Sequence, residues 1–210
     1  MLVSLFSVLV TSATGVSPIA PPLPTTAALP DTNCVVMNMP VEGRRSPLDS
    51  LTFTVHGSPV KICYGRPAAR GRTMIGGTSV PFGELWRTGA NEPTMIHTTG
   101  PLAIAGIRVA AGTYSLYTVP NVSDWQIIVN GATAQWGHER SYTSDVAAQE
   151  VGRATVPSRR VEDHVETFTI RAEPAGGEDV MLILEWEHTR VERSEEHTSE
   201  LQSQFRISYA

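Results

Sequence analysis

From residue 51 onward, apolar and polar residues alternate with a period of two, the pattern typical of half-buried β-strands. Candidate strands of this kind lie at 51–57, 60–65, 94–99, 125–129, 164–174 and 179–192, and 102–120 fits a strand, a tight turn and a second strand. In the last of them, Val180, Leu182, Leu184 and Trp186 share one face. Many short strands separated by turn residues predict an all-β fold, either an antiparallel β-sandwich or a jelly-roll-like barrel.

Turn signals divide these strands. Glycine-containing turns are expected at 57–59, 111–112 and 175–177, and Asn130-Gly131 is a strong hairpin signal. Helical periodicity is scarce: the best short helix lies at 82–87, and 143–153 fits a helical turn or an edge strand. We therefore expect a single β domain at 31–192 with one short helical segment.

The first thirty residues differ from the rest. Residues 1–30 carry no charge, and 2–10 form an apolar run too short to cross a bilayer, followed by small residues and a Pro/Thr/Ala stretch. This pattern predicts a signal-peptide-like leader and linker, and hence a secreted or periplasmic, cell-envelope protein. Because no positive charge precedes the apolar run, a mis-assigned start or a truncated leader is the alternative.

The chain has two cysteines, Cys34 and Cys63. In an exported protein they would form one disulfide that ties the N-terminal arm to the first strands. The alternative is two free or buried thiols.

The last eighteen residues have no pattern of their own. Back-translation of 193–203 resembles a common indexed sequencing adapter, and 207–210 fits the adapter segment that follows the index. We therefore interpret 193–210 as an adapter-derived artefact, the alternative being a natural polar tail.

Composition and charge limit the classes of partner that the protein is expected to bind. Hydrophobic residues make up 41% of the 210 residues, enough for a packed core, and the formal net charge is −5. The absence of a basic cluster argues against nucleic acid, and the absence of a long apolar run argues against a membrane span. The sequence does not indicate an oligomeric state.

Residues 63–97 hold the densest set of polar side chains among glycines. Arginine offers a planar fork that grips carboxylate or phosphate, so a small polar or anionic ligand is a candidate partner. The candidate ligand-binding residues are Arg66, Arg72, Arg87 and Asn91. Alternatively, the arginines pair with carboxylates and carbonyls and fix a long connection.

Catalytic signatures are missing from the sequence. No Gly-x-Ser-x-Gly elbow, His-Glu-x-x-His helix, Cys-x-x-Cys pair or His-x-His occurs, so we expect no metal and no cofactor. The alternative function is a hydrolase-like enzyme that uses Glu92 and His97 as acid and base, with arginines stabilising negative charge. The sequence does not decide whether the protein is an enzyme, and a non-catalytic role is preferred.

The segments "YGRPAARGRTMIGG", "VPFGELWRTGANEPT", "GIRVAAGTYSLYTVP" and "WQIIVNGATAQWG" resemble the DUF2911 family over roughly 34–192. This resemblance implies a β-rich, bacterial, often exported domain of unknown function, and it brings no reaction with it. The pattern singles out Tyr64, Arg66, Pro67, Gly71, Arg72, Trp86, Arg87, Gly89, Ala90, Asn91, Glu92, Gly112, Tyr114, Trp136 and Gly137. The prediction is thus an exported β domain that binds a small polar or anionic ligand, a carbohydrate or a partner.

Overall fold

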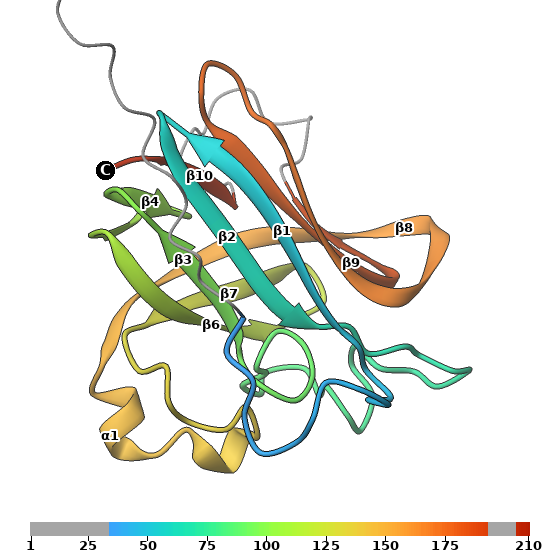
Figure 1. Cartoon of the computed structure of the whole chain (residues 1–210). Helices are drawn as coiled ribbons and strands as arrows, with labels where there is room; N and C mark the ends of the chain where they lie inside the picture. Colours follow the sequence, from blue (N-terminus) through green and yellow to red (C-terminus); the bar gives the residue numbers. More distant parts are fainter. Residues whose placement is uncertain (1–33, 193–204) are drawn as a thin grey trace, which may run out of the picture.

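The computed structural model describes residues 34–192 and 205–210 (Figure 1). The predicted leader and linker, 1–30, lie outside the described residues. The strands are β1 (Leu48–Val55), β2 (Ser58–Gly65), β3 (Thr94–Thr98), β4 (Leu102–Ile104), β5 (Ile107–Val109), β6 (Gly112–Pro120), β7 (Asp124–Asn130), β8 (Glu150–Pro174), β9 (Val180–Val191) and β10 (Arg206–Tyr209). A 3₁₀ turn, η1 (Glu139–Ser141), and one helical turn, α1 (Ser144–Ala147), lie between β7 and β8. The all-β prediction is confirmed.

The described strands form one antiparallel sheet in the order β1-β2-β3-β6-β7-β8-β9-β10-β4-β5. The long strand β8 belongs to both halves, because residues 150–157 pair with β7 and residues 158–174 pair with β9. The sheet folds over at β8, so that the two halves enclose one interior (Figure 1). The sandwich prediction is confirmed, and within the described residues the sheet does not close into a barrel.

Alternation along the strands builds the core. Every second residue from Val60 to Tyr64 in β2 and from Leu182 to Trp186 in β9 enters one apolar cluster that both halves of the sheet share. Its members include Val60, Ile62, Ile96, Leu116, Ile127, Ile104, Leu182, Leu184 and Trp186. The face predicted for β9 is therefore the buried one, with Val180 packed at its margin.

Trp86 sits at the centre of this core although it belongs to the long connection between β2 and β3. It stacks on Trp186 at 5.7 Å and meets Trp125 and Phe168 edge-on. Its backbone pairs with Thr118 of β6 through two hydrogen bonds of 2.7 and 2.8 Å. The prediction of a helix at 82–87 is therefore wrong: the segment makes a turn and then pairs with β6 through Trp86, whose ring is buried in the core.

Two turn predictions also need correction. The residues at 111–112 do not close a hairpin, since β5 pairs with β4 while β6 pairs with β3 and β7. The tight turn is at Ala105-Gly106, where both φ angles are positive. Asn130-Gly131 begins a long excursion over 131–149, because the buried Asn130 side chain bonds Ala132 N and Val146 O. The hairpins at 57 and at 175–177 are confirmed.

Part of the C-terminal tail is described. Residues 206–209 form β10 between β9 and β4, with Phe205 and Ile207 buried. An alternation of apolar residues suits a strand whatever its genetic origin, and here the strand is paired on both sides. The adapter interpretation of 193–210 therefore stays a prediction. No helix in the described part of the chain is long and apolar enough to cross a membrane.

Candidate functional site

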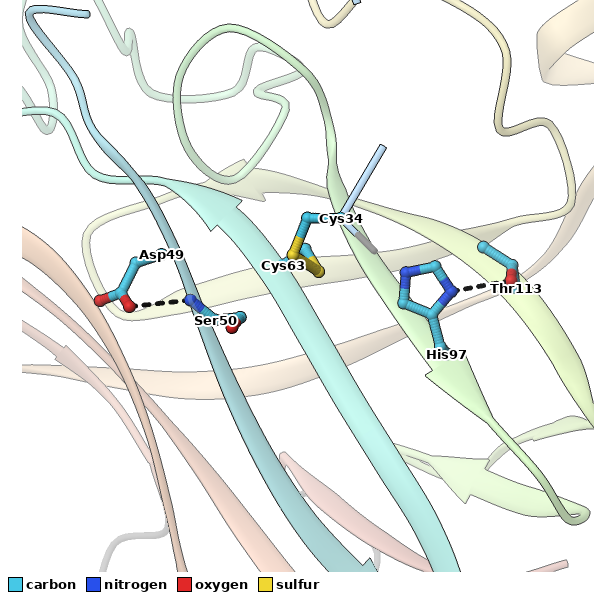
Figure 2. The surroundings of a disulfide bond; sticks show 6 residues. All are labelled: Cys34, Asp49, Ser50, Cys63, His97 and Thr113. Atoms are coloured by element: carbon cyan, nitrogen blue, oxygen red, sulfur yellow. Dashed lines mark hydrogen bonds between the residues drawn. A yellow bond between two sulfur atoms is a disulfide. The ribbon is translucent and has the colours of Figure 1, made fainter. Parts of the chain in front are cut away.

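The N-terminal arm, residues 34–46, is fixed to the sheet at its beginning and near its end. Cys34 forms a disulfide with Cys63 of β2, with the Cα atoms 5.6 Å apart (Figure 2). Cys63 lies on the face of β2 opposite to the core residue Ile62. The arm therefore lies against the outer face of the first half of the sheet.

The second attachment is a buried ion pair between Arg44 and Glu92. Two guanidinium nitrogens of Arg44 donate to the two Glu92 oxygens at 2.7 and 2.9 Å, and the Met37 N–H donates to the same carboxylate at 2.6 Å. The side chains of Arg44 and Glu92 are only 1% and 4% exposed. Burial by itself raises the pKa of Glu92, but the bonds from Arg44 and Met37 outweigh it and hold this pKa below its usual range. Glu92 is thus an ionised anchor with both oxygens engaged.

His97 lies on β3 with a different set of partners. Its Nδ1 is 2.8 Å from the Thr113 hydroxyl (Figure 2). Its strand partner in β2 is Lys61. Burial, and then the charge of Lys61, lowers the pKa of His97, so the ring is neutral at pH 7. Its Nε2 is buried and has no hydrogen-bond partner among the described residues. Glu92 bonds to Arg44 and His97 to Thr113, so the geometry does not favour these two residues as an acid–base pair.

Three of the four candidate ligand-binding residues hold loops in place. Arg66 donates to the Phe168 carbonyl, the Thr169 hydroxyl and the Asp49 carboxylate at 2.9–3.2 Å. It thereby joins the end of β2 to β8 and β1.

Arg72 and Asn91 act more locally. Arg72 donates to the carbonyls of Ala68 and Ala69, and Asn91 donates to the Ser46 carbonyl. Asn91 also takes a positive φ of 67°, which asparagine tolerates better than most residues. These contacts match the alternative in which the polar side chains fix the connection.

Arg87 differs from the other two arginines. Its contact with the Glu139 carboxylate is an ion pair of 3.6 Å, longer than a hydrogen bond. Its Nε is buried and, within the described structure, has no hydrogen-bond partner. The side chain as a whole is 21% exposed, so Arg87 is partly accessible to solvent while one buried donor, Nε–H, is not satisfied.

Arg87 interacts with Glu139 of the excursion over 131–149 and with Tyr117 of β6, and further residues of the excursion contact Tyr117. Gln135 donates from Nε2 to the Tyr117 hydroxyl at 2.9 Å, while its Oε1 is buried and unpartnered in the described part of the chain. Tyr142 packs edge-on against Tyr117 at 4.8 Å. Burial raises the pKa of Tyr117 to about 12, and Arg87 and Glu139 both act on it electrostatically. We call Arg87, Tyr117, Gln135, Glu139 and Tyr142 the Arg87 cluster.

Close backbone contacts hold the Arg87 cluster against the sheet. A Cβ at Gly137 would lie 2.1 Å from the Asn91 oxygen and 2.8 Å from Cδ of Arg87. A Cβ at Gly65 would lie 2.0 Å from the oxygen of Ala90. Only glycine permits these approaches, which explains two glycines of the quoted motifs by packing.

The sequence points to Arg87 but not to the residues that surround it. The Gln135 and Glu139 side chains lie on an excursion whose first residues predict a hairpin. The sequence likewise does not indicate Arg44 of the arm as the partner of Glu92. The nearest signal is "TAQWGHERSY", which is polar and aromatic and lacks strand alternation. No group of three His, Cys, Asp or Glu side chains suited to a metal occurs among the residues that the structure describes.

Comparison with known proteins identifies a family. The model of the family described as "Protein of unknown function (DUF2911)" matches residues 46–194. No curated protein and no solved structure gives a significant match. The family match covers the described fold from β1 to β9, the Trp86–Glu92 block and the Arg87 cluster. The chain therefore belongs to the DUF2911 family.

Proposed function

We propose that this protein is an exported, non-catalytic domain that binds a small neutral molecule rich in hydroxyl groups, a carbohydrate, at the Arg87 cluster. The observation that carries the proposal is a buried donor and a buried acceptor in one cluster, Arg87 Nε and Gln135 Oε1, that find no partner among the described residues. Such groups cost free energy unless a partner arrives. A hydroxyl both accepts and donates, so ligand hydroxyls suit both atoms.

The charges of the cluster favour a neutral ligand over an anion. Glu139 already stands 3.6 Å from Arg87 and balances its charge. An added carboxylate or phosphate would gain from Arg87 but be repelled by Glu139. Tyr117 is neutral at physiological pH because its pKa is about 12. Trp136, half-buried beside Gln135 in the chain, offers an apolar ring of the kind that packs on sugars.

The Cys34–Cys63 disulfide supports an oxidising location. Disulfides persist in the periplasm and outside the cell and are rare in the cytosol. Together with the apolar start of the sequence, it supports export to the cell envelope or beyond.

The test is isothermal titration calorimetry of the full chain with glucose, N-acetylglucosamine and gluconate. We expect at least one of the two neutral sugars to bind and gluconate, which adds a carboxylate, to bind more weakly. Arg87→Ala and Gln135→Ala should each weaken the binding at least tenfold, because each leaves a ligand hydroxyl unpaired. The matched control is Arg72→Ala, which removes an arginine whose guanidinium donates to carbonyls of its own turn.

Unfolding must be measured on the same variants. Arg87→Ala should change the melting temperature little, since a long, partly exposed ion pair contributes little to stability. Failure of all three compounds to bind at millimolar concentration would overturn the proposal. Equal binding by the wild type and Arg87→Ala would do the same.

A further inference from the structure

The pairing of β8 with β9 is irregular in the C-terminal half of β9. The register shifts between Arg160 and Val165 and again between Val165 and Thr169. Opposite this stretch, Glu187 has a φ of 53°, a backbone conformation that bulges a strand. The bulge alters which side chains face one another, and it brings His164 of β8 beside His188 of β9.

The two imidazole rings are neighbours. Their centroids are 5.2 Å apart and their planes meet at 68°. When two imidazoles bind one tetrahedral metal ion with metal–nitrogen bonds of about 2.0–2.1 Å, their ring centres also stand roughly 5 Å apart. The observed separation therefore matches that of two ligands on one ion.

The hydrogen bond of His188 fixes its tautomer. Its Nδ1 lies 3.2 Å from the Val161 carbonyl oxygen, which can only accept, so Nδ1 carries the proton. Nε2 then has a free lone pair. A ring nitrogen that donates to a backbone carbonyl while the other faces a metal is the usual arrangement for a histidine ligand.

Access to the pair is open. His164 is exposed and His188 is half-buried, so an ion can reach both rings from solvent. No third His, Cys, Asp or Glu of the described residues completes a metal-binding group here. Water or an external ligand would have to fill the remaining positions, as in metal sites that keep an open coordination position.

We propose that His164 and His188 form a two-histidine binding site for a divalent transition metal, Cu²⁺ above Ni²⁺ and Zn²⁺. Imidazole suits all three ions, and the order of affinity for a given nitrogen site places Cu²⁺ first. The site lies on the β8–β9 bulge and does not share residues with the Arg87 cluster, so the two proposals stand separately.

The test is a titration of the untagged full chain with Cu²⁺. Calorimetry measures the affinity and the stoichiometry, and electron paramagnetic resonance reports the nitrogen ligands. We expect one ion per chain and a hyperfine pattern from two nitrogens. His164→Ala should lower the affinity at least tenfold and leave one nitrogen signal, and His188→Ala should do likewise. His138→Ala removes another exposed histidine and is the matched control; it should change neither readout.

His164→Ala removes an exposed side chain, so it tests the site without endangering the fold. Circular dichroism without metal checks that His188→Ala, which loses the bond to Val161, is still folded. Unchanged Cu²⁺ affinity in His164→Ala would overturn the proposal. So would a wild-type spectrum showing a single nitrogen.

Discussion

Replacing Glu92 with glutamine tests the buried attachment of the N-terminal arm. The substitution keeps the size of the side chain and removes its charge. One oxygen can still accept from the Met37 N–H, but an amide NH₂ then faces the Arg44 guanidinium. Arg44 is left as a cation with a side chain only 1% exposed and without its counter-charge.

The magnitude follows from this burial. Removing one partner of a buried ion pair costs about 3–5 kcal/mol, whereas a solvent-exposed pair is worth about 0–1 kcal/mol. Because the glutamine amide would retain one acceptor oxygen, we expect the lower end, about 3 kcal/mol. For a domain of this size, that loss corresponds to a fall in melting temperature of roughly 6–12 °C.

The assay is urea unfolding at pH 7, followed by tryptophan fluorescence. Glu84→Gln is the matched control, since Glu84 is an exposed carboxylate of the same connection, and we expect it to change the free energy of unfolding by less than about 0.5 kcal/mol. The variant Arg44→Met/Glu92→Leu removes both charges together. It should recover much of the loss, because no buried charge is left unpaired.

The stability difference between the wild type and Glu92→Gln should also depend on pH. The pKa of Glu92 is lower in the folded state than the ordinary value of about 4.3, so its contribution is fully present above that value. The contribution is lost as the pH falls through the folded-state pKa. The difference in stability between wild type and Glu92→Gln should therefore shrink below about pH 4. A loss under about 1 kcal/mol at pH 7, or a difference unaffected by acid, would refute the buried-pair argument.

Three further predictions concern the stability of the domain. Gly65→Ala should destabilise the domain in urea unfolding by more than about 1 kcal/mol, because its Cβ would lie 2.0 Å from a backbone oxygen. The control Gly131→Ala should change the free energy of unfolding little, because the nearest atom to its Cβ would be 3.4 Å away. Cys34→Ser should lower stability by about 3–4 kcal/mol, since the bond to Cys63 closes a loop with a sequence separation of 29; reduction of the wild type with dithiothreitol should match it. Trp86→Ala should cost about 3–5 kcal/mol by removing the ring at the centre of the aromatic core, and a loss below about 1 kcal/mol would contradict the central position.

Local alternation was enough to predict most of the strands, although residues 154–163 of β8 were not among them. Residues such as Leu182, Leu184 and Trp186 recur at every second position, and a strand places such residues on one face whatever its neighbours are. The hairpins at 57 and 175–177 followed from glycine, whose preference for positive φ is also local. The fold class and most strand positions were therefore available from the sequence.

Which strands pair, and which polar groups meet, depended on the tertiary structure. The turn signal at Asn130-Gly131 did not produce a hairpin, because the buried Asn130 side chain bonds Val146 and Ala132 of the excursion that follows. Trp86 was drawn into the core from a long connection, which extended a segment predicted to be helical. Long-range burial of a large ring outweighs a weak local helix propensity.

The candidate sites show the same division. The sequence identified Arg87 as a polar residue among glycines, yet nothing local distinguished it from Arg66, each of whose guanidinium nitrogens donates to a partner. The partner of Glu92 is Arg44, and the partner of His188 is His164 across a bulge, and neither pairing leaves a periodic signal. The sequence determined the chemistry of the side chains and the faces of the strands. The folding of the sheet upon itself decided which side chains are paired and which are left with unsatisfied groups, because those contacts join residues far apart in the chain.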